Sequence, residues 1–191
     1  LMAACDEGHV RVALALLEKG ADTNAWNEEN GWTALMIACS QGLTDVALQL
    51  IGPKVDVNVK CKITGRSALL LAASVCEWVV VKALVSNGAD VRARDKEGYG
   101  ALTIASGQSG SLDVVLLLLR KGVDVNERCN SGWCPLMEAS YCVGQSSVAV
   151  ALLQHGAYVN VQDENGNTPL MFAVAKGNNS WCLRSLMKEQ I

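Results

Sequence analysis

Apolar residues gather along this chain in short blocks, and the order of the blocks repeats. Within Gly65–Glu97, a turn precedes the apolar run Ala68–Ala73, and a second run, Val79–Val85, ends at Asn87-Gly88. The sequence Ala-Asp-Val-Arg follows, and the same order begins again at Gly98. Each block predicts two short helices and a loop, and the chain is predicted to repeat this unit along its length.

The four residues after each second run fix the register of the repeat. They start at Ala21, Val55, Ala89, Val123 and Ala157, at intervals of 34 residues. The second residue of the first four copies is an aspartate: Asp22, Asp56, Asp90 and Asp124. Because a residue that recurs in a turn at the structural period usually holds backbone amides, we assign these aspartates to turn capping rather than to acid–base chemistry.

A second motif opens each unit with a glycine turn and the start of a helix. Its copies are Gly31-Trp-Thr-Ala-Leu-Met36, Gly65-Arg-Ser-Ala-Leu-Leu70, Gly98-Tyr-Gly-Ala-Leu-Thr103, Gly132-Trp-Cys-Pro-Leu-Met137 and Gly166-Asn-Thr-Pro-Leu-Met171. The two motifs together resemble the ankyrin repeat, whose pattern is G-x-T-P-L-H-x-A-A followed by G-A-D-V-N. The resemblance covers the whole chain. It implies an all-α repeat solenoid, an ankyrin-repeat array of helix-turn-helix units joined by β-hairpin-like loops.

One position departs from the ankyrin pattern in every copy. The histidine of the pattern, which hydrogen-bonds around the hairpin in that family, is replaced by Met2, Met36, Leu70, Thr103, Met137 and Met171. Without that hydrogen bond, we expect the hairpin turns to be held less firmly.

The motifs predict a single ankyrin-repeat domain, residues 1–191, with six units. Their approximate bounds are 1–30 (truncated), 31–64, 65–97, 98–131, 132–165 and 166–191. Each unit buries its apolar face against its neighbours, so we expect Leu117→Ala to cost about 2–5 kcal/mol of stability and Leu186→Ala to fray mainly the last unit. Because the first unit lacks its hairpin and terminal repeats normally present a polar outer face, we expect the chain to be a fragment of a longer array.

One second helix is predicted to end early. Lys54 stands where the other units have Gly20, Gly88, Gly122 and Gly156. Glycine suits a left-handed residue at a helix C-terminus. Here Gly52-Pro53 comes first, and proline cannot continue a helix, so the helix before it should be about one turn shorter.

The eight cysteines do not suggest a disulfide framework or a metal site. Cys5 and Cys39 share a repeat column in which Ala73 also stands. Neighbouring helices lie about 8–10 Å apart, beyond the roughly 7 Å between Cα atoms that a disulfide tolerates. The sequence has no Cys-x-x-Cys, and its two histidines are far apart, which argues against zinc. Free thiols indicate a reducing compartment, so we expect a cytoplasmic or nuclear protein.

Sequence motifs for catalysis or ligand chemistry are missing. There is no G-x-S-x-G, H-E-x-x-H or phosphate loop. Asp163–Asn167 begins like a calcium loop, but Thr168 and Val174 stand where glycine and glutamate are needed. We therefore expect no enzymatic activity, cofactor or metal. The net charge of −3 argues against a nucleic-acid partner, and no apolar run approaches the ~18 residues of a transmembrane helix.

Positions that differ between the units carry the candidate function. In ankyrin repeats these are the hairpin tips and the exposed positions of the first helices, which the resemblance places on one concave face. We expect the peptide-binding residues to be Trp26, Trp32, Lys60, Arg66, Arg94, Tyr99, Arg128, Trp133 and Tyr141. Exposed aromatic residues together with arginine are typical of interface hot spots.

This surface predicts a protein–protein interaction module that binds a linear peptide segment of another protein. The peptide should carry acidic residues opposite the basic side chains and apolar anchors on either side. One alternative is a reader of methylated lysine in a histone tail, with Trp26, Trp32 and Glu28 forming a cage through cation–π attraction. Another alternative is a purely structural scaffold or spacer.

Overall fold

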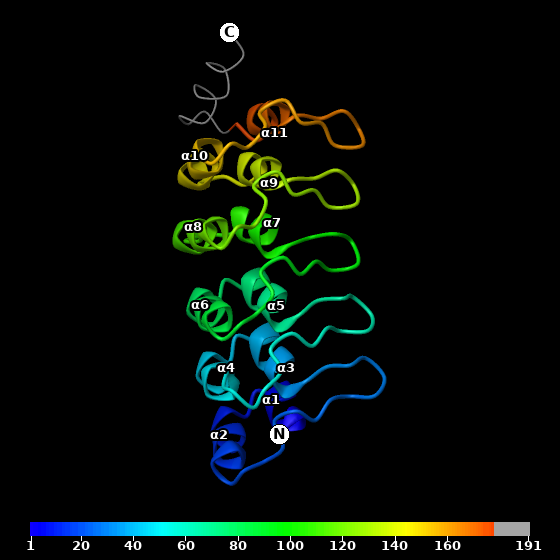
Figure 1. The fold of residues 1–191 in the computed structure, drawn as a ribbon, viewed down its shortest axis with the longest axis vertical. Helices are drawn as coiled ribbons and strands as arrows, with labels where there is room; N and C mark the ends of the chain where they lie inside the picture. The colour runs from blue at the N-terminus through cyan, green and yellow to red at the C-terminus, as the bar shows by residue number, and fades with distance from the viewer. Residues whose placement is uncertain (178–191) are drawn as a thin grey trace. The chain divides into compact units, whose positions relative to one another are not determined.

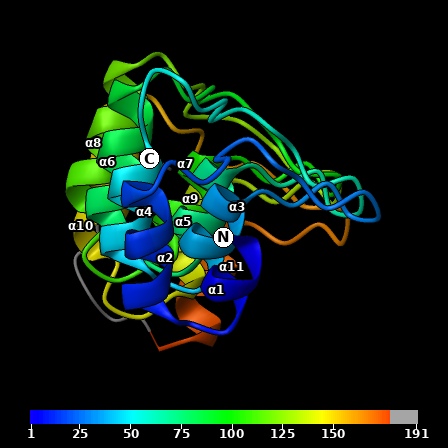
Figure 2. The same ribbon diagram turned by 90° about the horizontal axis from the view of Figure 1, so that it is seen from below.

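The structure is a computed structural model that describes residues 1–177, and these contain eleven α-helices and no strand (Figure 1). The helices come in pairs, and the loop after each complete pair projects away from the helices as a hairpin (Figure 2). Two hairpins contain an isolated antiparallel bridge, Trp26 with Thr33 and Lys60 with Ser67. The prediction of an all-α fold made of helix pairs is confirmed.

The chain divides into two compact units, Leu1–Lys96 and Glu97–Ile191, which we call the N-terminal unit and the C-terminal unit. The expectation of a single domain over residues 1–191 and the repeat bounds stay predictions. Residues 178–191, including Leu186 and the end of the expected last repeat, lie outside the described residues.

The N-terminal unit contains three helix pairs. They are α1 (Met2–Asp6) with α2 (Val10–Glu18), α3 (Ala34–Ser40) with α4 (Thr44–Leu50), and α5 (Ala68–Ser74) with α6 (Trp78–Ser86). The first helices α1, α3 and α5 pack in succession, and so do the second helices α2, α4 and α6. Each pair thus buries its apolar face against the next one.

The C-terminal unit repeats this packing. It contains α7 (Ala101–Ser106), α8 (Leu112–Arg120), α9 (Pro135–Tyr141), α10 (Ser146–Gln154) and α11 (Pro169–Ala175). Helix α9 packs between α7 and α11, and α10 packs against α8. No helix within residues 1–177 has the length and apolar character needed to cross a bilayer.

Four of the six residues that replace the histidine of the ankyrin pattern pack in the interior: Met36, Leu70, Thr103 and Met137 are at most 1% exposed. Met2 is half-buried and Met171 is 55% exposed. At α3, α5 and α9 the pattern's polar side chain is thus replaced by a buried apolar one.

The prediction that Leu117 is a core residue of α8 is wrong. Leu117 is half-buried, whereas its neighbour Leu118 is fully buried. Asp113 and Arg120 lie one turn before and one turn after Leu117 on the same face of α8, and both are exposed. The two charges mark this face as the one turned toward solvent, a signal that the run of four leucines concealed. The large loss of stability on truncation to alanine is therefore expected at Leu118 and not at Leu117.

The helix before Gly52-Pro53 is shorter than its counterparts, as predicted. α4 ends at Leu50, and the next residue, Ile51, is already extended with φ −70° and ψ 107°. α2 begins at the equivalent position and ends at Glu18, two residues further along the repeat. The shortening is confirmed, although it amounts to about half a turn rather than a full turn.

An asparagine in the recurring motif after α2, α4 and α8 joins one repeat to the next, a contact that we call the asparagine clip. Asp22 Oδ1 accepts a hydrogen bond from the Asn24 backbone amide at 2.9 Å. The Asn24 side chain then donates to the Lys54 carbonyl at 2.8 Å and accepts from the Asp56 amide at 3.4 Å. A single carboxamide therefore satisfies one donor and one acceptor of the next repeat.

The same clip recurs within both units. Asn58 bonds the Gly88 carbonyl and the Asp90 amide, and Asn126 bonds the Gly156 carbonyl and the Tyr158 amide. The prediction that the aspartate column holds backbone amides is confirmed at Asp22, Asp56, Asp90 and Asp124.

The turns between first and second helices require a left-handed backbone. Gly8, Gly42, Gly110 and Gly144 adopt φ values between 67° and 91° there. Cys76 occupies the same column with φ 62°, and it is the one non-glycine residue with positive φ in the described part of the chain. A side chain in this conformation costs roughly 1–2 kcal/mol.

Replacing this residue with glycine is expected to stabilise the protein. Cys76 is exposed, so Cys76→Gly loses little packing and removes the steric conflict of Cβ. After the larger backbone entropy of glycine in the unfolded chain is subtracted, we expect a gain of roughly 0.5–1 kcal/mol in the free energy of unfolding. Urea denaturation measures it. The matched control Cys76→Ala keeps Cβ, and an equal gain from it would contradict the backbone explanation.

The first turn of α7 is capped by a side chain that lies far from it in the sequence. α3 and α11 begin after Thr33 and Thr168, whose hydroxyls accept from the amides of Met36 and Met171. The equivalent residue before α7 is Gly100, which has no side chain. An acceptor for the first turn of α7 must therefore come from elsewhere.

Glu127 supplies that acceptor. Its Oε1 accepts from the Thr103 amide at 3.0 Å and from the Thr103 hydroxyl at 2.7 Å. The residue is only 4% exposed. A Cβ on Gly100 would lie 2.7 Å from its Oε2, so the carboxylate occupies the space that the absent side chain leaves.

Candidate functional site

The hairpin turns are held by one recurring side-chain position. In the N-terminal unit, Asn27 Oδ1 accepts from the backbone amides of Glu29 and Asn30. The next copy is Cys61, whose sulfur accepts from the Thr64 amide at 3.4 Å. Burial acts to raise the pKa of the Cys61 thiol, but hydrogen bonds from Thr64, Ile63 and Trp32 outweigh it and lower the pKa. Both turns therefore have a side-chain acceptor, although the residue type differs.

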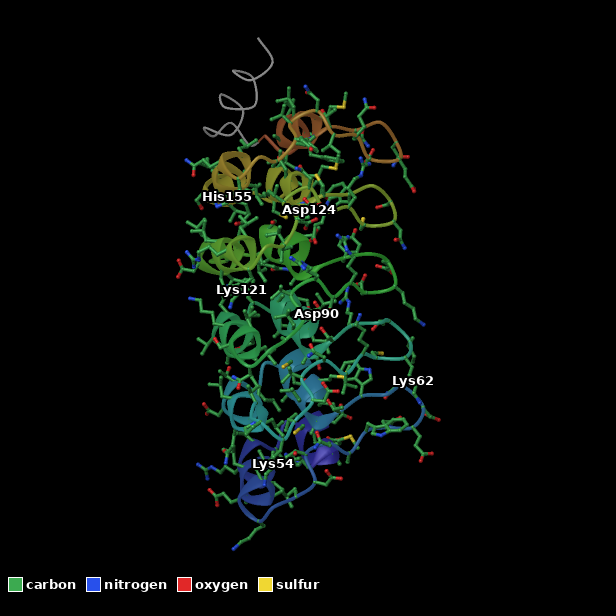
Figure 3. The ribbon with its side chains drawn as sticks, viewed as in Figure 1. Lys54, Lys62, Asp90, Lys121, Asp124 and His155 are labelled. Carbon is green, nitrogen blue, oxygen red and sulfur yellow. The ribbon has the colours of Figure 1, made fainter. Side chains whose placement is uncertain are left out.

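Several basic side chains of the hairpins bond the neighbouring hairpin. Lys62 Nζ donates to the Glu28 carbonyl at 2.8 Å, and Lys96 Nζ donates to the Lys62 carbonyl at 2.6 Å. Figure 3 shows Lys62 on the hairpin side of the N-terminal unit and Lys54 on the side of the second helices. In the C-terminal unit, Arg128 Nη2 donates to the Gln162 carbonyl. These cations link adjacent hairpins.

Arg66 forms an ion pair within the N-terminal unit. Its Nε lies 3.1 Å from Asp95 Oδ2, and the two side chains are 33% and 3% exposed. Asp95 is the next copy of the hairpin position held by Asn27 and Cys61. Of the other predicted basic residues in this unit, Lys60 is exposed and Arg94 is half-buried.

Trp26 and Trp32 lie on opposite faces of their hairpin. Trp26 pairs with Thr33 across the antiparallel bridge, so these two side chains share a face. Adjacent residues of a strand alternate between faces, which directs Trp32 to the other side. The geometry therefore does not bring the two indoles together, and it gives no support to a cage made by Trp26, Trp32 and Glu28.

The two indoles have different surroundings. Trp26 is 51% exposed, and Lys62 Nζ lies 4.4 Å from its ring centroid. Trp32 is half-buried and lines a cavity of about 300 Å³ together with Met2, Ala3, Asp6, Asn27, Asn30 and Ile37. This cavity lies between the start of α1, the start of α3 and the first hairpin, so it has one aromatic wall and one carboxylate.

The C-terminal unit contains a cluster of three aromatic rings, which we call the aromatic cluster: Trp133, Tyr141 and Phe172. The ring centroids of Trp133 and Phe172 are 4.5 Å apart, and Tyr141 meets both edge-on at 6.0 and 6.1 Å. Tyr141 is 41% exposed, and the other two rings are half-buried. The rings come from a hairpin, α9 and α11, so the cluster spans two successive repeats.

The structure thus brings two of the predicted residues together and adds one that the sequence analysis missed. Trp133 and Tyr141 were predicted, and Phe172 was not. Phe172 occupies the repeat column of Ile37, Leu71, Ile104 and Glu138. A single aromatic residue in a column that otherwise holds three aliphatic residues and Glu138 is the signal that could have identified it.

Tyr99 lies next to the hairpin of the following repeat. It is half-buried. Burial and the neighbouring Cys129 raise the pKa of Tyr99 to about 12, so its phenol stays protonated at neutral pH. It is therefore a hydrogen-bonding aromatic residue and not a general base.

The thiols of the described residues are free. They are Cys5, Cys39, Cys61, Cys76, Cys129, Cys134 and Cys142. Burial, with a contribution from Glu77, raises the pKa of Cys39 to about 12, which keeps this thiol protonated and unreactive. The described residues contain no group of three or more metal-ligating side chains.

Comparison with known families gives one match. A family described as ankyrin repeats (3 copies) matches residues 1–61, 43–129, 69–163 and 127–191, which together span the whole chain. Ankyrin repeats are generally protein–protein interaction modules and are typically non-catalytic. No curated protein matches the sequence.

Proposed function

Because this chain belongs to the ankyrin-repeat family, we propose that it is a non-catalytic module that binds a peptide segment of a partner protein on its hairpin and first-helix surfaces. The observation that carries this proposal is the aromatic cluster. Three rings gathered from a hairpin and two first helices stay partly exposed, and aromatic side chains held in this way are typical interface anchors. Ordinary core packing would have buried them.

We further propose that the bound segment combines apolar and acidic residues. Trp133, Tyr141 and Phe172 offer apolar surface to one part of the segment. In the N-terminal unit, Lys60 and Arg94 would meet carboxylates of the segment, since both are cationic and arginine pairs bidentately with a carboxylate. A carboxylate that meets Arg66 or Arg128 would compete with Asp95 or with the Gln162 carbonyl. The free thiols favour a cytoplasmic or nuclear location.

A structural scaffold is the second candidate function. The hydrogen bonds of Lys62, Lys96 and Arg128 to neighbouring hairpins favour it. They show that basic residues can serve the stability of the array itself. A scaffold would bind no short segment through the aromatic cluster.

Removing the central ring of the cluster is expected to abolish most of the affinity. Segments that bind the protein are first selected from a displayed peptide library. Trp133→Ala should then weaken their binding by about 2 kcal/mol or more, roughly 30-fold, as hot-spot truncations do. Isothermal titration calorimetry measures the change.

Tyr158→Ala is the matched control for this test. Tyr158 is 68% exposed in the C-terminal unit, and only its backbone amide takes part in the clip with Asn126. Equal affinities for the two variants would contradict a role of the aromatic cluster. Failure to select any segment would favour the scaffold function.

A further inference from the structure

The aromatic cluster already holds a cation of its own chain. Lys176 Nζ lies 4.1 Å from the centroid of the Tyr141 ring. Lys176 directly follows α11 and is exposed. A cation placed this close to a ring centroid is attracted by the negative face of the ring, so the exposed face of Tyr141 is suited to a positive charge.

A carboxylate borders the same rings. Glu138 lies one helical turn before Tyr141 on α9, a spacing that makes two side chains neighbours. Its Oε2 accepts a hydrogen bond from Trp133 Nε1, and its Oε1 accepts a weak one from Cys142 Sγ at 3.8 Å. Burial raises the pKa of Glu138, although the hydrogen bonds from Trp133 and Cys142 oppose it.

Among the residues that the structure describes, no cationic side chain forms an ion pair with Glu138. Glu138 is half-buried, and it accepts hydrogen bonds from an indole and a thiol. A half-buried carboxylate beside aromatic faces is a complementary environment for a cation that also presents several N–H donors.

We propose that the aromatic cluster and Glu138 form a binding site for an arginine side chain of the partner segment, which replaces Lys176 above Tyr141. This inference rests on the proposed function, since it names the residue that enters the surface described there. The aliphatic part of the arginine packs on the rings and provides one of the apolar contacts. The acidic residues of the segment meet other hairpins.

The chemistry of the site favours arginine over lysine. A guanidinium is planar, stacks on aromatic faces and is more weakly hydrated than an ammonium. Its fork of N–H donors can reach a carboxylate while the plane stays on a ring. Lys176 supplies a resident ammonium to Tyr141 but makes no ion pair with Glu138, so an incoming guanidinium gains a partner that Lys176 leaves unused.

The test uses three capped amino acids as probes. N-acetyl-arginine methylamide, N-acetyl-norleucine methylamide and N-acetyl-trimethyllysine methylamide are titrated into the full chain with ¹⁵N labelling. The indole Nε1–H of Trp133 reports binding, because it donates to Glu138. The arginine probe should shift this signal saturably in the millimolar range, and the norleucine probe should bind at least about tenfold more weakly.

Variants separate the parts of the site. Glu138→Gln and Tyr141→Leu should each weaken binding of the arginine probe about fivefold or more. Lys176→Ala should strengthen it about threefold, since the competing cation is gone. Tyr158→Leu, which changes an exposed ring outside the cluster, should leave it unchanged. Thermal melting confirms that each variant is folded.

The outcomes are distinct for the two proposals. The arginine site is overturned if the Trp133 signal does not saturate, if norleucine binds as well as arginine, or if Lys176→Ala weakens binding. Tighter binding of the trimethyllysine probe would replace arginine with methylated lysine as the ligand. If these results coincide with displayed segments that still depend on Trp133, only the arginine site fails and the proposed function stands.

Discussion

Gly100→Thr alone is expected to destabilise the C-terminal unit by roughly 2–3 kcal/mol, and adding Glu127→Val is expected to recover most of that loss. A Cβ at Gly100 would lie 2.7 Å from Glu127 Oε2 and 2.8 Å from its Oε1. The carboxylate is buried and bonded to Thr103. It cannot move aside without losing both hydrogen bonds, so the threonine meets a filled space.

Glu127→Val alone should also be destabilising, by roughly 2–3 kcal/mol, because it leaves the Thr103 amide and hydroxyl without this acceptor. The double variant reproduces the pair that accompanies α3, which begins after Thr33 and has Val59 in the Glu127 column. In the double variant the threonine hydroxyl can cap α7 itself, while valine fills the former place of the carboxylate.

A double-mutant cycle measured by urea denaturation tests this pairing. We expect a coupling free energy of about 1.5–3 kcal/mol between the two positions, the upper range for residues in contact. Additive single effects would show that the two residues act separately. Gly107→Thr with Glu127→Val is the matched control pair, since Gly107 approaches Glu138 and not Glu127.

Leu118→Ala is expected to cost about 2–5 kcal/mol, because truncating a fully buried leucine removes apolar burial and leaves a cavity. Leu117→Ala in the same helix should cost clearly less, since Leu117 is half-buried. Hydrogen exchange should show the loss of protection concentrated in Glu97–Lys176, because the chain forms two compact units and repeats unfold in local blocks. A uniform loss from Leu1 onward would contradict this expectation.

The fold followed from the sequence because its signals are periodic. The aspartate column recurs at intervals of 34 residues and the opening glycine turns at 33 or 34, so each copy supports the reading of the others. The capping of α7 was not predicted, since it depends on two residues that break the pattern. Gly100 lacks the capping hydroxyl, and Glu127 is a charged residue in a column of small or β-branched side chains. The relation between Gly100 and Glu127 is visible only in the structure, where the two residues are in contact.

The candidate surface was predicted less completely, for two physical reasons. Repeat register locates a residue on a hairpin but does not state which face it occupies, and Trp26 and Trp32 lie on opposite faces. The repeat register also does not show whether a charged side chain already bonds another residue of the chain. Arg66 pairs with Asp95, and Arg128 bonds the Gln162 carbonyl, which are contacts between repeats that no single repeat reveals.

The clips made by Asn24, Asn58 and Asn126 constrain the number of residues between successive repeats. Each one spans to residues 30 and 32 positions further on. The hairpin Asp95–Gly98 is one residue shorter than Cys61–Gly65, yet Gly98 to Gly110 is one residue longer than Gly31 to Gly42, so the interval of 34 is kept. A chain with this constant spacing can gain or lose whole repeats of 34 residues by duplication or deletion. In such a change each remaining asparagine would still lie opposite a backbone carbonyl 30 positions further on.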